Sequence, residues 1–410
     1  MITAAPDSAK QEQSYSCPLC GGAIYKHSYR STGLVSITSL REIVPAQNAF
    51  YFCNRCGHTS TPSWTDLDSY YAGDYHILTD SEEQDQLYEV LDGEPIFRSN
   101  HQARTMLQKL ALPVNAKVLD FGCAKGATAK RALAAQPDLQ MHLFDVSERY
   151  LPFWNKFLAN DRYATFSTPA SWRESFDAVT SFFVLEHVVN PRETLGTMRN
   201  LLKAGGLLYF IVPNPYANIG DFVIADHTHH YSPESIKNLV KLSGFELVEI
   251  DETSHRAAFV VVARKTETSS AMLGYAVCRH QLDEGNRNNA LRIKVEAIAR
   301  YWEWFGSDVR KFEDSLPLGS RTAIYGAGFY GTFLLTCLAN PERVVAFMDR
   351  DPYLQGECHR GRQVFAPDAL PSDIDVVYIG VNPNIAYQIP SMSCWNGRNI
   401  RFFIPNGLIG

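Results

Sequence analysis

The sequence lacks several features that would place a protein in a narrow class. It has no run of about 18 apolar residues, so no segment is expected to span a membrane. It has no basic excess, because 38 lysines and arginines face 44 acidic residues and the net charge is −6, which disfavours a nucleic acid as the main partner. The polar N-terminus has no apolar segment of the kind found in secretory signals, so the cytoplasm is the expected compartment.

The length and the cysteines narrow the class further. A chain of 410 residues exceeds one ordinary hydrophobic core, so two or three domains are expected. Hydrophobic residues make up 45% of the sequence and charged residues 20%, which is usual for a globular protein. The nine cysteines are an odd number, and without a secretory signal they favour metal binding over disulfides.

Two CxxC pairs lie near the N-terminus, in CPLCGG and FCNRCGH. They comprise Cys17, Cys20, Cys53 and Cys56. A two-residue spacer brings both thiolates to one side of a tight turn, and two such turns complete a closed tetrahedral site for a structural Zn²⁺ ion. Unrelated cysteines or a redox pair are the alternatives. A zinc ribbon that binds nucleic acid is a functional alternative, which the lack of a basic stripe disfavours.

The stretch AKVLDFGCAKGATAKRALAA predicts a buried strand, a glycine-rich loop and an amphipathic helix. The loop has the form DxGxAxG and contains Asp120, Gly122, Ala124 and Gly126. Small residues let a ligand approach the backbone at a helix N-terminus, at the C-terminal edge of a parallel strand. The next strand ends at Asp145, where an acid can accept hydrogen bonds from a ribose diol.

Two further segments extend this pattern. Residues 176–188, FDAVTSFFVLEHV, predict a fourth strand, and residues 201–215, LLKAGGLLYFIVPNP, predict a helix, a turn and a fifth strand. In this order the motifs resemble class I S-adenosylmethionine-dependent methyltransferases. The resemblance implies that Asp120 lies near the methionine amino group and that Asp145 holds the ribose, with Cys123 as a small filler. The implied cofactor-binding residues are Asp120, Gly122, Cys123, Ala124, Gly126, Asp145, Val146 and Phe182.

Beyond residue 265 the sequence changes character. Residues 283–315 predict a long connecting helix, and residues 321–340 predict a second strand, glycine loop and helix. The loop is a GxGxxG motif formed by Gly326, Gly328 and Gly331, and Asp349 ends the following strand. This unit predicts a second Rossmann-like domain. Its loop can bind NAD, or it can serve only to pack a helix against a sheet.

The order of zinc module, methyltransferase core and Rossmann-like tail resembles the sugar C-methyltransferase family over nearly the whole chain. Members of that family methylate a carbon of a nucleotide-linked keto-deoxysugar. The C-terminal part carries the resemblance in IYGAGFYGTFLL, MDRDPYLQG and IGVNPN, and VLEH places a family histidine at His187. Residues 224–227 match a Y-x-E-H segment whose histidine is the family's proposed base, and HRAA, which starts at His255, matches an H-G-G segment.

The sequence departs from the family at several of these positions. Ile224 replaces the tyrosine and Asp226 replaces the glutamate. Arg256 and Ala257 replace the two glycines. These changes keep the base and alter the groove around it, so methylation of another sugar, or of oxygen or nitrogen, is an alternative.

Carbon methylation sets a specific chemical demand on the site. A proton next to a ketone must first be removed, and histidine suits this step because its pKa is near neutrality. We therefore expect His227 to be the base, Asp226 to orient its imidazole, and His187 to stabilise the developing oxyanion. Tyr75 and His255 are expected in the acceptor site, with an ordinary packing role as the alternative for Tyr75.

The stretch IADHTHHYS contains His227, His229 and His230. A metal site in which His227 and His229 share one face of a strand is an alternative to the base. For His229 and His230 we expect a solvated turn. The turn leads into a helix that Ser232 caps, with Pro233 at its first position.

The sequence thus predicts an α/β protein with a class I methyltransferase Rossmann-like core, a small N-terminal Cys₄ zinc module and a second C-terminal Rossmann-like domain. The expected boundaries are 1–70 for the zinc module, 71–265 for the methyltransferase domain, 266–315 for the helical connector and 316–410 for the C-terminal domain. The expected cofactors are S-adenosylmethionine and structural zinc. The expected partner is a small molecule, a nucleotide-linked sugar or a related metabolite, bound by a monomer that contacts no nucleic acid or membrane. An oxidoreductase or binding protein that uses NAD at the C-terminal loop is an alternative of another class.

Overall fold

The computed structural model describes residues 15–24, 26–75, 81–91, 94–267 and 284–405. Its largest element is a seven-stranded sheet in the order β12-β11-β10-β13-β14-β17-β16, in which β17 is antiparallel to both of its neighbours. The strands are β10 (Lys117–Phe121), β11 (Gln140–Asp145), β12 (Tyr163–Thr165), β13 (Phe176–Phe182), β14 (Leu202–Pro213), β16 (Phe245–Asp251) and β17 (Ala258–Lys265). This sheet confirms the predicted α/β class.

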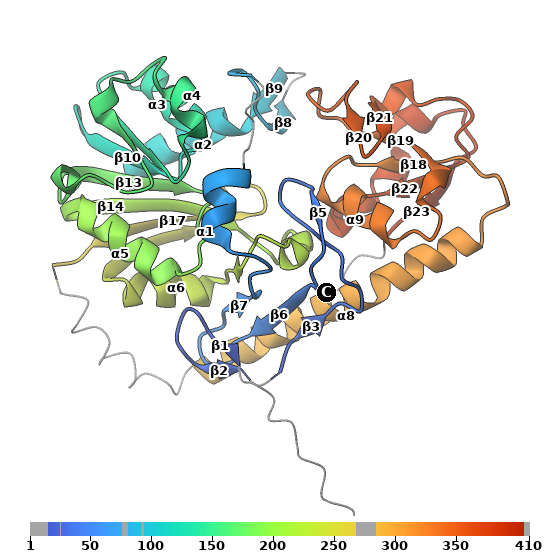
Figure 1. Cartoon of the computed structure of the whole chain (residues 1–410), viewed down its shortest axis with the longest axis horizontal. Helices are drawn as coiled ribbons and strands as arrows, with labels where there is room; N and C mark the ends of the chain where they lie inside the picture. Colours follow the sequence, from blue (N-terminus) through green and yellow to red (C-terminus); the bar gives the residue numbers. More distant parts are fainter. Residues whose placement is uncertain (1–14, 25, 76–80, 92–93, 268–283, 406–410) are drawn as a thin grey trace, which may run out of the picture.

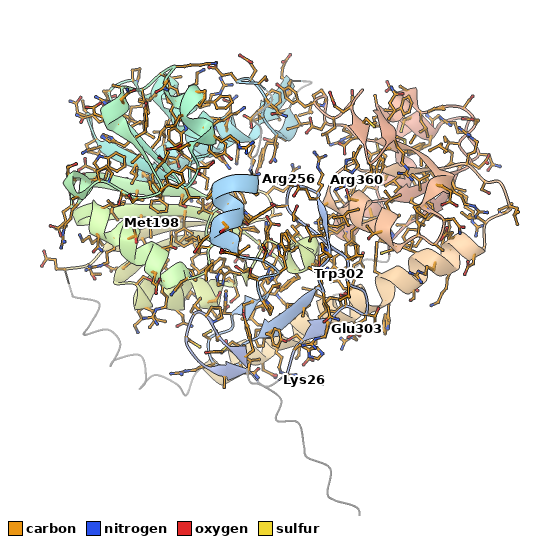
Figure 2. The ribbon with its side chains drawn as sticks, viewed as in Figure 1. Lys26, Met198, Arg256, Trp302, Glu303 and Arg360 are labelled. Atoms are coloured by element: carbon orange, nitrogen blue, oxygen red, sulfur yellow. The ribbon has the colours of Figure 1, made fainter. Side chains whose placement is uncertain are left out.

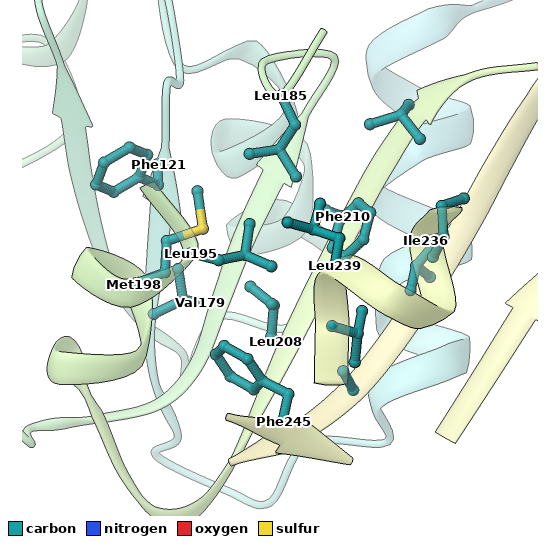
Figure 3. Packing of buried hydrophobic residues seen from close by; sticks show 14 of the residues in the cluster. Phe121, Val179, Leu185, Leu195, Met198, Leu208, Phe210, Ile236, Leu239 and Phe245 are labelled. Carbon is teal, nitrogen blue, oxygen red and sulfur yellow. The ribbon is translucent and has the colours of Figure 1, made fainter. Parts of the chain in front are cut away.

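Helices cover both faces of this sheet (Figure 1). They are α2 (Arg98–Leu110), α3 (Ala127–Ala135), α4 (Leu151–Trp154), α5 (Pro191–Leu201) and α6 (Pro233–Leu242). Along β14, Leu208 and Phe210 pack in one cluster with α5 and α6, while Tyr209 and Ile211 pack in another with α2 and α3. Figure 3 shows the first cluster, where Met198 of α5 and Leu239 of α6 meet the sheet. The period of two along a strand buries alternate side chains on opposite faces.

Local signals account for most element ends. Helix α6 begins as predicted, because the Ser232 hydroxyl accepts from the Ser235 amide and Pro233 takes the first position. Two predictions differ from the structure. Strand β13 ends at Phe182, since Phe183 has a left-handed φ of 57°, and the rest of 176–188 is a loop. No turn separates α5 from a later strand, because β14 already begins at Leu202 and contains both glycines of the GG pair.

The N-terminal residues form short strands and turns. The elements are β1 (Tyr15–Ser16), β2 (Ala23–Ile24), β3 (Tyr29–Arg30), β4 (Ser36–Ile37), β5 (Ile43–Val44), β6 (Ala49–Phe52), β7 (Thr59–Ser60), α1 (Leu67–Ser69), a π-helix (Tyr70–Asp74), β8 (Leu87–Leu91) and β9 (Glu94–Phe97). One four-stranded sheet, in the order β15-β7-β6-β3, contains β15 (His229–His230) from the centre of the chain. The N-terminal segment is therefore joined to the methyltransferase-like core by backbone pairing.

The C-terminal part is a six-stranded sheet in the order β20-β21-β19-β18-β22-β23, in which β20 is antiparallel. Its strands are β18 (Thr322–Tyr325), β19 (Val344–Met348), β20 (Cys358–His359), β21 (Arg362–Phe365), β22 (Val376–Ile379) and β23 (Arg401–Phe403), with helices α9 (Phe329–Cys337) and α10 (Pro383–Ala386). The long helix α8 (Glu284–Asp314) runs beneath the N-terminal strands and on to this sheet (Figure 1). On α8, Trp302 is buried and its neighbour Glu303 is exposed (Figure 2).

One hydrophobic cluster joins three parts of the chain. It contains Tyr29, Phe50 and Phe52 of the N-terminal strands, Ile219, Phe222 and Val223 of the central segment, and buried residues of α8, α9 and the C-terminal sheet. Trp302 of α8 also donates its ring N–H to the Ile219 carbonyl oxygen at 3.1 Å. No helix among the described residues is long and apolar enough to cross a membrane.

The glycines of the C-terminal GxGxxG motif are explained by close backbone packing. A Cβ on Gly326 would lie 2.3 Å from the Gly380 carbonyl oxygen, and a Cβ on Gly331 would lie 1.9 Å from that of Gly326. Of the three glycines of this motif, Gly328 is the one at which an added Cβ would meet no atom within 4 Å. Both packing glycines are needed to bring α9 against the sheet, and this holds equally for a loop that binds a dinucleotide at Gly328 and for one that only packs.

Candidate active site

A cavity of about 1330 Å³ lies at the C-terminal edge of the parallel strands of the large sheet. Loops at this edge are where open α/β sheets bind ligands. Of the predicted cofactor residues, the following line it: Asp120, Gly122, Cys123, Ala124, Asp145, Val146 and Phe182. Gly126 does not. A Cβ there would crowd Leu143 at 3.0 Å and Phe157 at 3.2 Å, so this glycine serves the packing of α3.

The loop after β10 packs closely against the loop after β13. Gly122 has a φ of 76°, and a Cβ on it would lie 2.5 Å from a methyl of Val184. The amide of Ala124 donates to Asp145 Oδ2 at 2.8 Å, which ties the loop to the end of β11. Any side chain at Gly122 would therefore strain the backbone and displace the opposite loop.

Two buried acids face this loop. Burial and the nearby Asp145 charge raise the pKa of Asp120 to about 7, and burial raises the pKa of Asp145 to about 6. The described partner of Asp120 is the hydroxyl of Thr180, at a long 3.5 Å. A buried carboxylate with so little compensation favours a cationic partner, and the α-ammonium of S-adenosylmethionine is such a group. The residues thus fit the predicted cofactor.

His227 faces the cavity from the segment that follows β14. Its Nδ1 lies 2.5 Å from Asp221 Oδ1, and its Nε2 has no hydrogen-bond partner among the residues that the structure describes. Burial alone lowers its pKa, but the charge and hydrogen bond of Asp221, with Asp226 and Glu186, outweigh this and raise the pKa to about 9. The imidazolium form is therefore favoured at neutral pH, in contrast to the near-neutral pKa expected from the sequence.

The carboxylate that orients His227 is Asp221, where the sequence predicted Asp226. Asp226 is fully buried and points to the N-terminal segment, where it accepts from the Ser39 amide at 2.6 Å and the Ser39 hydroxyl at 2.7 Å. The Tyr71 hydroxyl lies 3.2 Å from its second oxygen. Since its oxygens are occupied in this way, Asp226 acts on His227 only through its charge.

His187 lies beside His227, with the two ring centroids 4.7 Å apart. Its Nδ1 lies 2.6 Å from the Tyr71 hydroxyl and 3.1 Å from the backbone oxygen of Asp226. Because that carbonyl only accepts, it favours the tautomer with the proton on Nδ1 and a lone pair on Nε2. Burial and the neighbouring His227 lower the pKa of His187 to about 4, so its ring is neutral where His227 is charged.

Glu186 completes this group. Its side chain is 1% exposed, its Oε1 lies 4.0 Å from His187 Nε2, and its Oε2 has no hydrogen-bond partner among the described residues. Burial raises the pKa of Glu186 to about 8 although the His227 charge opposes this. Glu186, His187 and His227 each place a nitrogen or oxygen within 4.8 Å of the others. Perturbed groups of this kind are common in active sites.

The other two histidines of the cluster differ from the sequence prediction. His229 and His230 form β15, which pairs with β7, and they are 2% and 0% exposed, so they are not a solvated turn. His229 Nε2 lies 2.9 Å from the Val188 carbonyl oxygen and its Nδ1 lies 3.1 Å from His58 Nε2. The structure therefore does not bring His229 together with His227 as a pair of metal ligands.

The predicted acceptor residues Tyr75 and His255 both line the cavity. Tyr75 packs its ring 5.9 Å from that of His187. His255 lies against Tyr88 and His101, and its Nδ1 is 3.2 Å from the backbone oxygen of the next residue, Arg256, which Figure 2 labels. Their position beside the catalytic candidates is compatible with either substrate contact or packing.

The four predicted cysteine ligands meet as the spacing requires. The sulfurs of Cys17 and Cys56 are 3.7 Å apart, those of Cys20 and Cys53 are 3.6 Å apart, and all four lie within 4.8 Å of one another. Sulfurs at these separations surround a space suited to a tetrahedral Zn²⁺ ion, whose Zn–S distance is about 2.3 Å. The donor set therefore fits zinc.

Sequence reasoning missed several residues of this site. Asp221 and Tyr71 contact the two candidate catalytic histidines, Ser39 holds Asp226, and Glu186 places a carboxylate oxygen within 4.8 Å of a ring nitrogen of each histidine. The sequence did offer a signal for Glu186, because it directly precedes His187 in the loop after a parallel strand. Asp221 lies in a short 3₁₀ helix and Tyr71 in a π-helix, where neither strand nor α-helix periodicity predicts a facing residue.

Comparisons with known proteins agree with the fold. The family described as a methyltransferase domain matches residues 97–250. A ubiquinone biosynthesis O-methyltransferase of Roseobacter denitrificans is 28% identical over 153 residues, which are 32% of this chain and 61% of that protein. One of Azoarcus sp. is 27% identical over 173 residues, 37% of this chain and 73% of that protein. The structure of a SAM-dependent methyltransferase from Aquifex aeolicus matches 41% of this chain and 93% of its own, at 16% identity and a TM-score of 0.34.

These matches cover only the central part of the chain. Each of them covers less than half of this chain, and the chain spans about three fifths of the length of the Roseobacter relative. The family match coincides with the large sheet and with the loops that line the cavity. Residues 97–250 therefore match a methyltransferase domain, and the large sheet has the α/β fold of class I methyltransferases.

Proposed function

We propose that this methyltransferase transfers a methyl group to a carbon of a nucleotide-linked keto-deoxysugar or a related small molecule. The observation that carries the proposal is the His227–Asp221 pair, which presents a free imidazole nitrogen to the cavity beside the glycine loop. Transfer to oxygen or nitrogen of a reactive substrate depends mainly on positioning. A carbon acceptor needs a base as well, and neutral His227 is proposed to be that base.

In its neutral form, which becomes the major form only above its pKa of about 9, His227 is proposed to remove a proton from the carbon next to the substrate's ketone. The C–H electron pair then forms the enolate double bond, and the carbonyl oxygen takes the negative charge. S-adenosylmethionine, when bound, would supply an electrophilic methyl group: the enolate carbon would form its new bond as the sulfonium S–CH₃ bond breaks, with S-adenosylhomocysteine as the neutral leaving group. Asp221 orients the ring of His227 and stabilises the imidazolium that results.

Glu186 is proposed to stabilise the developing oxyanion, because a carboxyl group whose pKa is about 8 carries a proton at neutral pH and can donate it in a hydrogen bond. His187, whose ring N–H faces the Asp226 carbonyl, would not donate to the oxyanion in this tautomer. Tyr71 and the Asp226 carbonyl hold the orientation of His187. Asp120 and Asp145 are proposed to bind the ammonium and ribose groups of the cofactor, and Tyr75 and His255 to contact the acceptor.

The four cysteines are proposed to hold one structural Zn²⁺ ion. All four ligand positions would be filled by protein thiolates, which leaves no position for a substrate. The ion would fix the two turns that carry β1, β2, β6 and β7. Its role is therefore to fold the N-terminal segment, which supplies Ser39 and Tyr71 to the site.

The test uses S-adenosylmethionine with a ¹³C-labelled methyl group and a panel of nucleotide-linked 4-keto sugars, with the products examined by NMR. A signal at the shift of a carbon-bound methyl that disappears in His227→Ala supports the proposal. A methyl group on oxygen or nitrogen would refute carbon methylation. Retention of the rate in His227→Ala would refute the assignment of the base.

Methylation of oxygen is the second candidate, because the Roseobacter and Azoarcus relatives are named as O-methyltransferases. A hydroxyl acceptor needs a weaker base and no enolate. The same labelled experiment with phenolic and sugar hydroxyl acceptors distinguishes it, since the carbon shift of an O-methyl group differs from that of a C-methyl group.

A further inference from the structure

A continuous chain of hydrogen bonds leads from the N-terminal segment to His227. Thr61 Oγ1 lies 2.9 Å from His230 Nε2. His230 Nδ1 lies 2.8 Å from Asp221 Oδ2, and the other oxygen of the same carboxylate binds His227. Asp221 is 1% exposed and His230 is 0% exposed. The proposed base is thus the last member of a buried series of four side chains.

The direction of the donors in this chain follows from the chemistry of each partner. The Asp221 carboxylate only accepts, so both imidazoles donate to it from Nδ1. Burial lowers the pKa of His230 despite the Asp221 charge, so His230 is neutral and its Nε2 carries a lone pair. The Thr61 hydroxyl donates to that lone pair. Thr61 therefore selects the tautomer in which His230 donates to Asp221.

The backbone holds this chain in register. Strand β7 pairs with β15 through Thr59 and His230 and through Ser60 and His229. Just beyond the strand, the Thr61 amide donates to the Thr228 carbonyl oxygen at 3.0 Å. Both ends of the Thr61–His230 contact are thus fixed by main-chain bonds, so the contact is a consequence of the fold and not of a chance rotamer.

The strand that carries Thr61 is itself attached to the cysteine site. In the turn that carries Cys53 and Cys56, the Cys53 amide donates to the His58 carbonyl oxygen and the Gly57 amide donates to the Cys53 carbonyl oxygen. His58 directly precedes β7. His58 Nε2 also contacts His229 Nδ1 at 3.1 Å. This turn, β7 and β15 therefore form one short path from the cysteines to Asp221.

We propose that His230 and Thr61 are positioning residues for His227, so that the N-terminal segment is a working part of the active site. His230 shares the carboxylate of Asp221, which disperses its charge and fixes the direction in which it faces His227. This inference rests on the proposed function for the role of His227 as base. The hydrogen-bond chain itself is independent of the acceptor.

Other ionisable groups face this chain and enter its titration. Around His227 they are Asp226, Glu186, His187 and Tyr71, and near His230 they are His229 and His58. From α9, the Tyr330 hydroxyl accepts from the amide of Gly220, next to Asp221. Each of them stays in place when Thr61 or His230 is changed, so their contribution is common to all variants compared.

The test measures the titration of His227 in the full chain labelled with ¹³C at histidine Cε1. The variants are Thr61→Val, which keeps the shape of the side chain, and His230→Phe, with His227→Gln to assign the signal. The matched control is Thr322→Val, because Thr322 is 1% exposed on β18 and its hydroxyl has no hydrogen-bond partner among the described residues. The kcat and the KM for S-adenosylmethionine are measured on the same proteins as a function of pH.

Loss of the His230 donor in His230→Phe, or of the Thr61 hydroxyl that holds the His230 tautomer in Thr61→Val, leaves more of the Asp221 charge to His227. The His227 midpoint is therefore expected to rise by about 0.5 to 1 unit in both variants and to stay unchanged in the control. The kcat is expected to fall by about 10- to 100-fold with an unchanged KM for the cofactor, because a small misplacement of a base reduces proton transfer. The pH profile of kcat should move upward with the NMR midpoint.

An unchanged His227 titration midpoint in Thr61→Val would overturn the inference. Because this variant is isosteric, it tests the positioning role even if His230→Phe fails to fold. If the midpoint shifts while no keto sugar is methylated by the wild type, the proposed function fails and the positioning role stands. If methyl transfer to carbon occurs and both variants match the control in kcat and midpoint, the proposed function stands and the positioning role fails.

Discussion

Asp221→Asn is expected to lower the pKa of His227 more than any other single substitution around the cavity. In the wild type this pKa is raised to about 9, against an ordinary value of 6.5, and Asp221 is both the nearest charge and the hydrogen-bond partner. An opposite charge at this distance changes a pKa by about 1 to 3 units, which corresponds to about 1.4 to 4 kcal/mol. The midpoint should therefore fall to between about 6 and 8.

The assay is the pH titration of the ¹³Cε1 signal of His227 in the labelled full chain, which needs no acceptor. Asp226→Asn is the informative comparison, because Asp226 contributes charge but no hydrogen bond to His227. Its effect should be in the same direction and smaller. Asp349→Asn, which removes a carboxylate that binds the Ala327 amide in the other sheet, is the control. Equal shifts in Asp221→Asn and Asp226→Asn, or no shift in either, would refute the reasoning from the structure.

Four further predictions follow from other parts of the molecule. One equivalent of Zn²⁺ per chain should be found by elemental analysis; Cys53→Ser should lose it and melt at lower temperature, whereas the exposed Cys358→Ser should not. S-adenosylmethionine at 100 times its Kd should stabilise the protein by about 2.7 kcal/mol, and Asp120→Asn should weaken its binding. NAD should shift no melting curve, and a shift would show that the C-terminal loop binds a dinucleotide at its open Gly328. Lys125→Met should speed amide hydrogen exchange in residues 81–86, because the Lys125 ammonium binds the backbone oxygens of Ser81, Glu82 and Gln84. Lys130→Met should have a smaller effect, because the Lys130 side chain is more exposed. The pKa of His227 is raised to about 9 in the folded protein, so protonation of His227 stabilises the fold fully below pH 6.5, and this stabilisation is lost as the pH rises through about 9. Over this range, urea unfolding should show a fall of up to about 3 kcal/mol in the free energy of unfolding, and a smaller fall in the His227→Gln variant.

The parts of the fold that the sequence predicted are those with local signals. The glycine loop after β10 is such a case, because a strand, small residues and a helix follow one another within 20 residues and their order fixes where the loop lies. The cap of α6 is another, since Ser232 and Pro233 act on the turn that contains them. The cysteine site was predicted because a two-residue spacer already determines half of its geometry.

What the sequence did not predict depends on residues that are distant in the chain. The burial of His229 and His230 results from pairing with β7, about 170 residues earlier, and nothing in HTHHYS indicates that partner. Asp221 lies in the 3₁₀ helix Ile219–Val223 and His227 lies beyond its end, so no single periodicity relates their side chains. Asp226 was the natural choice by adjacency, but Ser39 and Tyr71 occupy its oxygens from a separate part of the chain.

The turn that carries Asp221 is held from the C-terminal side of the chain as well. Trp302 of α8 donates to the Ile219 carbonyl oxygen, and Tyr330 of α9 accepts from the Gly220 amide at 2.7 Å, so two hydrogen bonds reach the backbone next to this acid. A chimera that exchanges the C-terminal half for that of a relative would therefore replace two supports of the backbone next to Asp221. Such a chimera would keep the orientation of Asp221 only if the residues equivalent to Trp302 and Tyr330 were retained.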